Sequence, residues 1–341
     1  MIKPKVLIIY TGGTIGMIKN PETGSLSSVD FTHVYDQIPE LNRVNAEVSS
    51  VSFQKPIDSS EMSIGNWQEI ATIISDNYHE FDGFVVLHGS DTMAYTASAL
   101  SFMLEGLQKP VILTGSQLPI GVIRTDGKEN IITAIEIAAE RRMDGSPLIQ
   151  EVGVYFDYTL FRGNRCTKDS AENFEAFRSP NLRPLAVAGV SLNYNEEIFW
   201  KSDATDLILR KDMSDEVLLI KLFPGMRFEF LHKIIEMENL KGLVIESFGA
   251  GNGPQNEVFA SALKNFNDRG GVILNITQCS SGSVSAGMYE SSNIFNEAGV
   301  VSGGDMTTEA AVTKLMYLLA NAPKDKVKEM LRKSIRGEIT H

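Results

Sequence analysis

Hydroxyl and carboxylate side chains gather in four short segments of the sequence, and each segment follows an apolar run. The segments are residues 11–14 after KVLIIY, residues 58–60 after EVSSVSF, residues 90–91 after GFVVLH, and residues 116–117 after PVILTG. Short apolar runs bounded by turn residues indicate buried β-strands. In parallel α/β sheets, ligands bind beyond the carboxyl ends of the strands. The pattern therefore predicts a site for a small polar ligand at one edge of a sheet.

Thr14, in the segment YTGGTIG, is a candidate nucleophile. A hydroxyl is a weak nucleophile at neutral pH and needs a proton acceptor. Lys168, which follows the apolar run VGVYF, is a candidate acceptor if burial beside carboxylate and hydroxyl groups keeps its amine neutral. Glycines 12, 13 and 16 would let backbone N–H groups approach a developing oxyanion. Together these residues favour nucleophilic catalysis by a threonine.

Motifs for other chemistries are missing or incomplete. The sequence has no GxxxxGK[ST], and in GAGNGPQ a proline takes the third glycine position of GxGxxG. It has no CxxC and no HExxH, so we predict neither a metal nor a nucleotide cofactor. The segment SVSAG departs from the GxSxG elbow of Ser-His-Asp esterases. His88, at the end of an apolar strand, is interpreted as a hydrogen-bonded core residue and not as a base.

Composition limits the class of partner. The 341 residues are 43% hydrophobic and 22% charged, and the formal net charge is −12. A nucleic-acid partner would require a basic face, which no Lys/Arg cluster provides. No apolar run is long enough to cross a bilayer, and no signal segment precedes the first apolar run, so we expect a cytoplasmic protein without a membrane partner. Cys166 and Cys279 are expected to be small, buried, reduced thiols.

The elements that position these residues alternate between strands and helices. Apolar runs recur with helical stretches such as NIITAIEIAAERR between them, which indicates a parallel sheet covered on both faces. Residues 192–214 interrupt this alternation with a charged stretch that has no sustained period. We therefore predict two α/β domains, residues 1–191 and 215–341, joined by a linker or small hairpin at 192–214.

Long segments of the chain resemble the bacterial L-asparaginases. The two signature segments are YTGGTIG and HGSDTMAYTASALSFML, and the similarity continues through PIDSSEM, KPVILTGSQLP, RTDGKEN, FRGNRCTK, SPNLRPL, FGAGNGPQN and TQCSSGSV. The chain is most similar to the cytoplasmic, type I branch. The resemblance implies a large N-terminal domain with a mixed, mostly parallel sheet flanked by helices, and a smaller C-terminal parallel α/β domain. It also implies a homotetramer, built as a dimer of dimers, that hydrolyses L-asparagine without a cofactor.

The resemblance implies the catalytic roles residue by residue. Thr14 matches the family's first threonine, which attacks the side-chain amide carbon and forms an acyl-enzyme. Ser90 stands where the family most often has its second threonine. Asp91 and Lys168 match the partners of that threonine in a triad for proton transfer and water activation.

The resemblance also implies the substrate contacts. Asp91 matches the carboxylate that holds the α-ammonium group, and Ser90 lies beside it. Ser59 matches the residue that binds the α-carboxylate, with Asp58 and Ser60 on either side of it. Ser116 matches the position whose backbone carbonyl receives the amide nitrogen.

The sequence departs from the family pattern at three places. Serine at position 90 keeps the hydroxyl but loses a methyl group that restrains its rotamer. The loop NPETGSLSS lacks the usual tyrosine, Ser25 or Leu26 falls nearest to it, and Tyr35 is the next tyrosine along the chain. Some type I relatives bind asparagine at a second site through an arginine, where this chain has Glu246. We therefore expect the reaction rate to depend hyperbolically on asparagine.

Other interpretations remain open at this stage. Residues 90–91 could simply cap the following helix, residues 12–14 could form a tight turn, and Lys168 could be a surface lysine. At the level of function, the chain could be an ammonia-donating amidotransferase subunit, because a transfer-RNA amidotransferase subunit shares these signatures. It could also be a non-catalytic amino-acid sensor of the same fold. The release of ammonia by the purified chain alone separates these possibilities.

Overall fold

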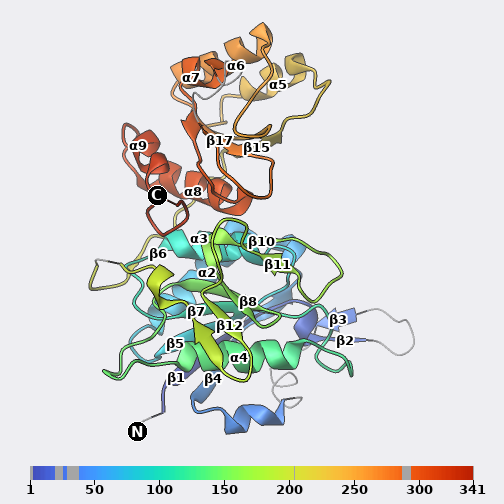
Figure 1. Ribbon diagram of the computed structural model, residues 1–341, viewed down its shortest axis with the longest axis vertical. Coiled ribbons are helices and arrows are strands. Elements are labelled where there is room, and N and C mark those ends of the chain that lie inside the picture. The colour runs from blue at the N-terminus through green and yellow to red at the C-terminus, as the bar shows by residue number, and fades with distance from the viewer. Residues whose placement is uncertain (1–2, 20–25, 29–37, 203, 286–292, 341) are drawn as a thin grey trace. The chain divides into compact units, whose positions relative to one another are not determined.

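The structure is a computed structural model that describes residues 3–19, 26–28, 38–202, 204–285 and 293–340. Contacts between residues divide the chain into two compact units (Figure 1). The N-terminal unit comprises Met1–Ser179 and Arg183–Lys211, and the C-terminal unit comprises Pro180–Leu182 and Asp212–His341. Each unit is built around a β-sheet of its own.

An eight-stranded sheet forms the centre of the N-terminal unit, in the order β13-β12-β9-β8-β7-β5-β1-β4. Its strands are β1 (Lys5–Gly12), β4 (Glu47–Ile57), β5 (Gly83–Leu87), β7 (Val111–Thr114), β8 (Val152–Phe156), β9 (Thr159–Arg162), β12 (Ala186–Ala188) and β13 (Leu192–Tyr194). β4, β1, β5, β7 and β8 run parallel, and β9, β12 and β13 each pair antiparallel with a neighbour. The predicted mixed, mostly parallel sheet is confirmed.

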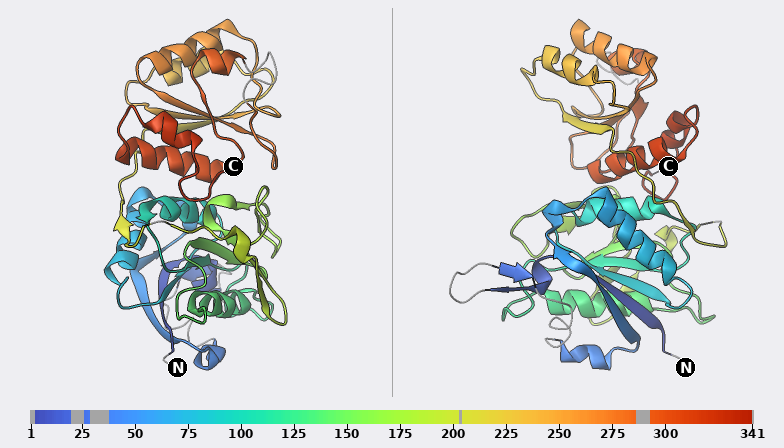
Figure 2. Two further views of the ribbon diagram at one scale, coloured as in Figure 1. Left: turned by 60° about the vertical axis from the view of Figure 1, so that its left-hand side comes forward. Right: turned by 180° about the vertical axis from the view of Figure 1, so that it is seen from behind.

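Helices cover both faces of this sheet. α2 (Ile64–Asp76) and α3 (Met93–Met103) lie on one face, and α4 (Gly127–Ala139) lies on the other (Figure 2). Every residue of β5 is buried, as expected for a strand covered on both sides. Ile131 and Ile135 of α4 are four residues apart and therefore point to the same side, where they share one core cluster with Ile8 of β1.

Short elements complete the N-terminal unit. They are η1 (Thr14–Gly16), β2 (Met17–Lys19), β3 (Leu26–Ser28), η2 (Pro39–Arg43), η3 (Ser59–Glu61), β6 (Leu104–Glu105), η4 (Gly163–Arg165), β10 (Thr167–Lys168), β11 (Phe177–Arg178), η5 (Glu196–Ile198) and β14 (Ile208–Leu209). β2 pairs with β3, β10 with β11, and β14 with β6. β13 and β14 lie inside the predicted linker, and both pair with strands of the N-terminal unit.

A four-stranded parallel sheet forms the centre of the C-terminal unit, in the order β15-β16-β17-β18. Its elements are β15 (Val217–Lys221), α5 (Phe228–Ile235), β16 (Gly242–Ser247), α6 (Glu257–Asp268), β17 (Val272–Thr277), α7 (Asn293–Glu297), β18 (Val301–Ser302), α8 (Thr308–Asn321) and α9 (Val327–Arg332). The apolar faces of α5, α6 and α7 share one core cluster with β16 and β17. The predicted smaller parallel α/β domain is confirmed.

A buried ion pair holds the end of the chain against the C-terminal unit. Lys314 Nζ of α8 lies 2.5 Å from Glu338 Oε1, and both side chains are 0% exposed. Lys314 also donates to the carbonyls of Leu331 and Lys333, while Glu338 accepts from two backbone N–H groups just before it. Burial lowers the pKa of Lys314, and the Glu338 carboxylate opposes that shift. The pair is thus fully enclosed and hydrogen-bonded on both sides.

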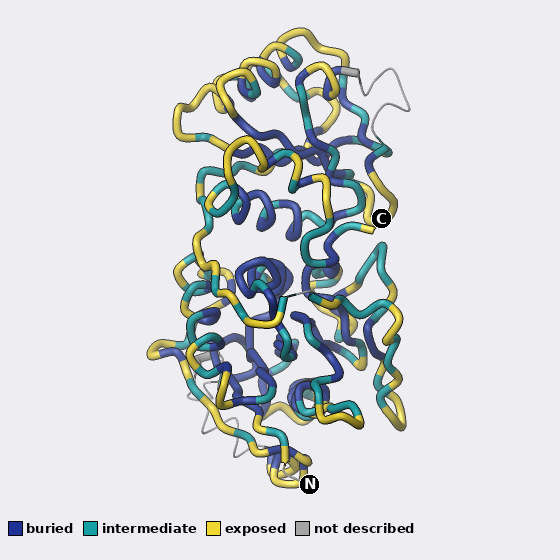
Figure 3. Tube along the Cα trace, turned by 90° about the vertical axis from the view of Figure 1, so that its left-hand side faces the viewer, coloured by how far each residue is buried: buried dark blue, intermediate teal, exposed yellow. Residues whose placement is uncertain are grey.

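The buried residues are concentrated in the strands of the two sheets and in the helices that cover them (Figure 3). Cys166 is buried as expected, but the prediction for Cys279 is wrong, because it lies exposed in the loop that follows β17. Of the helices that the structure describes, none has the length and apolar character needed to cross a bilayer.

Candidate active site

The carboxyl ends of β1, β4, β5 and β7 pack closely at one edge of the N-terminal sheet. Gly13, with φ 88°, donates its N–H to the carbonyl of Ile57 at 3.2 Å. A Cβ atom on Gly13 would lie 2.5 Å from the backbone nitrogen of Gly89, and a Cβ atom on Gly115 would lie 2.2 Å from the carbonyl oxygen of His88. Only glycine permits such close contact between backbones. The four segments predicted from the sequence therefore meet at one place.

Thr14 begins η1, directly after Gly13. The next residue, Ile15, is fully buried and accepts a backbone hydrogen bond from Ile120, which anchors this turn. Thr14 itself is half-buried. Within the described part of the chain, its hydroxyl has no hydrogen-bond partner. Thr14 therefore presents a hydroxyl without a partner among the described residues, beside the loop that carries Ser90.

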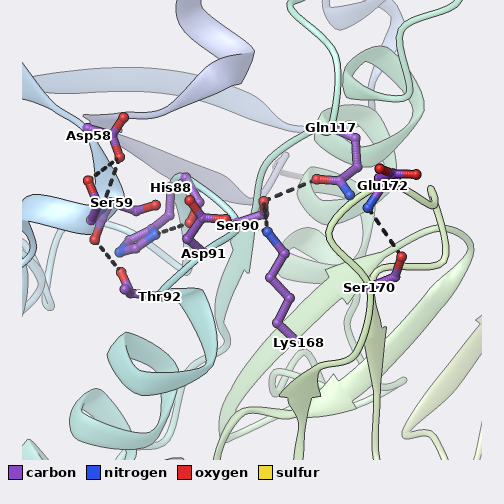
Figure 4. A network of polar contacts seen from close by, with 12 residues as sticks. Asp58, Ser59, His88, Ser90, Asp91, Thr92, Gln117, Lys168, Ser170 and Glu172 are labelled. Atoms are coloured by element: carbon purple, nitrogen blue, oxygen red, sulfur yellow. Dashed lines mark hydrogen bonds and ion pairs between the residues drawn. The ribbon is translucent and has the colours of Figure 1, made fainter.

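Lys168 contacts both Ser90 and Asp91 (Figure 4). Lys168 Nζ lies 2.9 Å from Ser90 Oγ and 2.5 Å from Asp91 Oδ1. The Lys168 side chain is 17% exposed, whereas the Asp91 side chain is 64% exposed. An enclosed amine thus joins a buried hydroxyl to a carboxylate that remains open to a ligand. Lys168 comes from β10, 77 residues beyond Asp91, so the fold and not the local sequence brings the two together.

Asp58, Ser59 and Ser60 form the turn after β4. Asp58 Oδ1 accepts from both the backbone N–H and the hydroxyl of Ser60, each at 2.9 Å, and so caps η3. The carbonyl of Ser59 accepts from the hydroxyl of Thr92 at 2.7 Å. A Cβ atom on Gly89 would lie 2.5 Å from Ser59 Oγ, so this hydroxyl lies against the loop before Ser90. Asp58 therefore shapes the turn, while Ser59 reaches the centre of the site.

Gln117 is a part of the site for which the sequence predicted no role. Its Oε1 accepts from Ser90 Oγ at 3.1 Å (Figure 4). Its Nε2 donates to the carbonyl of Asn173 at 2.9 Å. The neighbouring Ser116 is 1% exposed and donates to the carbonyl of Leu118 at 2.6 Å. The position of Gln117 at a strand end, within TGSQ, was the available signal.

Asp126 and Asn130, at the start of α4, hold the turn after β7. The Asp126 carboxylate accepts from the backbone N–H groups of Gln117 and Leu118 at 3.0–3.2 Å. Asn130, which is 0% exposed, donates to the carbonyl of Gly115 at 3.0 Å and to Asp126 at 3.2 Å. Asp126 is the N-cap residue of α4, but its carboxylate serves this turn and makes no capping bond. The segment RTDGKEN contained these residues, but it carried no sign of their target.

Glu246, on β16, has partners within the C-terminal unit. It is 9% exposed, its Oε1 accepts from Thr308 Oγ1 at 2.5 Å, and its Oε2 lies 3.4 Å from Lys221 Nζ. Thr308 is the first residue of α8, and a negative charge is favourable at the N-terminus of a helix. The carboxylate therefore supports α8, and the expected hyperbolic kinetics remain a prediction.

Two further expectations concern groups at or near the site. Ser25 and Tyr35, named above for the missing loop tyrosine, lie outside the described residues, and Leu26 belongs to β3. Where the structure describes the chain, no three His, Cys, Asp or Glu side chains are grouped so that they could hold a metal ion.

Two family models match the chain. The description "Asparaginase, N-terminal" matches residues 5–200, and "Glutaminase/Asparaginase C-terminal domain" matches residues 216–331. The chain is 40% identical to L-asparaginase 1 of Escherichia coli strain K12 over 342 residues, which is 100% of this chain and 99% of that protein.

Two other proteins are also similar. The 60 kDa lysophospholipase of Homo sapiens is 40% identical over 360 residues, which cover 98% of this chain and 61% of that protein. The crystal structure of L-asparaginase I from Vibrio cholerae superposes with a TM-score of 0.90 at 38% identity, covering 100% of both chains.

Proposed function

The chain belongs to the asparaginase family, as its resemblance predicts, and we propose that it hydrolyses L-asparagine to L-aspartate and ammonia. The observation that supports this most directly is the contact of Lys168 Nζ with both Ser90 Oγ and Asp91 Oδ1. A hydroxyl, an amine and a carboxylate in contact can move protons during hydrolysis of an amide. The hydroxyl of Thr14, on the adjoining loop, supplies a nucleophile for the same reaction, and it has no partner within the part of the chain that the structure describes.

The reaction that we propose has two steps. Thr14 Oγ1 attacks the side-chain amide carbon of asparagine, a C–O bond forms and the C–N bond breaks. The hydroxyl proton of Thr14 passes to the leaving nitrogen, which departs as ammonia. Water then attacks the resulting ester, releases aspartate and returns a proton to Thr14. Splitting the hydrolysis in this way replaces one difficult step by two easier ones and needs no cofactor.

Ser90, Lys168 and Asp91 are proposed to carry the protons of both steps. The Ser90 hydroxyl donates to Gln117 Oε1 at 3.1 Å and accepts from Lys168 Nζ at 2.9 Å, so it is already linked to the amine with which we propose that it exchanges a proton. The second contact of Lys168, to Asp91, keeps its amine directed at this hydroxyl. Serine in place of threonine keeps the reacting oxygen and gives up only a rotamer restraint.

We propose that the exposed Asp91 and the buried Ser59 and Ser116 bind different groups of the substrate. Asp91 is open enough to bind the α-ammonium group. Ser59 Oγ would donate to the α-carboxylate, with the Asp58 carboxylate and Ser60 shaping the turn around it. The carbonyl of Ser116 would accept from the amide nitrogen, because the Asp126 hydrogen bonds hold the turn that carries it.

A measurement of ammonia release by the purified wild-type chain and Thr14→Ala tests this function. We expect wild-type turnover of L-asparagine and a loss of several orders of magnitude in kcat for the variant, because removing a nucleophile eliminates the covalent route. Thr313→Val, a similar loss of a threonine hydroxyl on α8, should leave kcat unchanged. If Thr14→Ala kept a substantial share of the wild-type rate, Thr14 would not be the nucleophile.

The same assay addresses the alternative functions. Binding of asparagine without ammonia would indicate a sensor, and ammonia release that depends on a partner enzyme would indicate an amidotransferase subunit. We also propose a cytoplasmic homotetramer, a dimer of dimers, which acts without nucleic acid or membrane. The resemblance to the type I branch supports this proposal, and analytical ultracentrifugation measures the assembly.

A further inference from the structure

A chain of buried hydrogen bonds leads from α2 to the peptide that precedes Ser90. Trp67 Nε1 lies 3.0 Å from Thr96 Oγ1, and Thr96 Oγ1 lies 2.9 Å from His88 Nε2. His88 Nδ1 lies 2.6 Å from the carbonyl oxygen of Gly89. His88 and Thr96 are 0% exposed and Trp67 is 8% exposed, so these contacts do not compete with bulk water.

The chemistry of the groups at its two ends gives this series of hydrogen bonds a single direction, from the Trp67 indole to the Gly89 carbonyl. The carbonyl of Gly89 can only accept, so His88 Nδ1 carries a hydrogen and donates it. Burial lowers the pKa of His88 to about 4, so the imidazole is neutral at neutral pH and its Nε2 accepts. The indole N–H of Trp67 can only donate, which leaves the Thr96 hydroxyl hydrogen to His88 Nε2. Each group thus has one role, and His88 has one tautomer.

The direction of these hydrogen bonds decides where the N–H group of Ser90 points. In a trans peptide the carbonyl and the following N–H point in opposite directions. Because His88 holds the Gly89 carbonyl on its own side, the N–H of Ser90 points away from His88. Among the residues that the structure describes, this N–H has no acceptor. The close packing of Gly89 against Gly13 and Ser59 restricts the peptide further.

We propose that Trp67, Thr96 and His88 are positioning residues, which hold the Gly89–Ser90 peptide so that the Ser90 N–H stabilises the developing oxyanion (Figure 4 shows His88 and Ser90). The inference rests on the proposed amide hydrolysis. None of the three side chains contacts the reacting atoms. They act because an oxyanion donor works only when it is fixed in place before the charge develops.

Substitution of Thr96 tests the proposal, because its hydroxyl links the other two side chains. Thr96→Val removes the hydroxyl at nearly constant volume and leaves His88 Nε2 without its donor. We expect kcat for asparagine to fall about 10- to 100-fold, since a misplaced group of this kind costs up to about 100-fold. KM should stay within about threefold, because the peptide stabilises the transition state more than the bound substrate. Thr96→Ser should restore kcat.

Thr313→Val is the matched control, because Thr313 is also 0% exposed on a helix and, among the described residues, bonds only to carbonyls of its own helix. Its kcat should equal that of the wild type. A wild-type kcat in Thr96→Val, or no recovery in Thr96→Ser, would overturn the proposal.

Nitrogen NMR of the imidazole provides a readout that is independent of activity. The wild-type His88 signal, identified by its absence in His88→Asn, should show the tautomer protonated at Nδ1. A tautomer protonated at Nε2 would overturn the proposal even in an active enzyme. A wild-type chain that releases no ammonia would instead overturn the proposed function, and the tautomer in the same sample would still decide whether the hydrogen-bond chain exists.

Discussion

The burial of His88 predicts a defined dependence of stability on pH. Burial lowers the pKa of His88 in the folded state to about 4, and its hydrogen bond to Gly89 opposes this shift. In the unfolded chain a histidine has a pKa of about 6.5. Between these values the unfolded state binds a proton that the folded state does not, so the free energy of unfolding falls as the pH falls. At about 1.4 kcal/mol per pH unit, the interval corresponds to a loss of about 3 kcal/mol.

The assay compares wild type with His88→Asn in urea titrations between pH 4 and pH 8. The asparagine amide does not titrate, so the stability of His88→Asn lacks the pH-dependent contribution of the histidine. Both tryptophans, Trp67 and Trp200, lie in the N-terminal unit, so their fluorescence reports unfolding of the unit that contains His88. The two proteins have the same carboxylates, so the carboxylate contributions cancel when the two unfolding free energies are subtracted. We expect the difference in unfolding free energy to be constant above pH 6.5 and to change by about 3 kcal/mol between pH 6.5 and pH 4.

The exposed His79 provides the control. His79→Asn makes the same substitution at an exposed position and shows what the substitution alone does to the stability curve. If the curve of His88→Asn ran parallel to that of the wild type through this pH range, the reasoning from burial would be refuted.

The remaining predictions concern the site and the end of the chain. Ser90→Thr should retain activity and Ser90→Ala should lose it, since the hydroxyl carries the role; steady-state kinetics decide, and an active Ser90→Ala would remove Ser90 from the mechanism. Lys168→Met should lower kcat by about 10²–10⁴-fold, whereas Asp91→Ala should in addition raise KM. Wild-type values of kcat and KM in both variants would contradict the proposed roles of Lys168 in proton transfer and of Asp91 in substrate binding. Glu338→Gln leaves a buried lysine without its counter-charge and should destabilise the C-terminal unit by about 3–5 kcal/mol in thermal unfolding, whereas Asp268→Asn, which breaks an exposed pair, should cost less than about 1 kcal/mol. Equal effects of these two substitutions would argue against the role of burial.

The local pattern of the sequence was enough to predict the sheet edge and four segments of the site. Strands such as GFVVLH are continuous apolar runs bounded by turn residues, which is the signal of a strand buried on both faces. Ser116 follows such a run directly, and Ser90 and Thr14 follow theirs after a short stretch that contains glycine, so their place at the carboxyl edge comes from the strand direction alone. The resemblance to a known family added the fold and the proposed roles, and it favoured Lys168 as a proton acceptor over a surface lysine, two interpretations that the local pattern had left open.

Short strands escaped the sequence because two or three residues carry no periodic signal. β13 and β14 lie in a stretch predicted to be a linker or small hairpin. β13 pairs with the preceding strand β12, whereas β14 pairs with β6, which is distant in the sequence. The sequence also did not show that Cys279 is exposed, because cysteine is a residue type that is often buried.

Only the tertiary structure decided which groups are partners. The hydrogen bonds of Ser90 with Lys168 and Gln117 span 78 and 27 residues, and the bond of Trp67 to Thr96 spans 29. A side chain's partner, its burial and hence its pKa depend on what other parts of the chain place beside it. His88 illustrates this most clearly. Its sequence position indicated a core residue, but the direction of its hydrogen bonds follows from Thr96, which the fold places at Nε2, and from the carbonyl of the adjacent Gly89 at Nδ1.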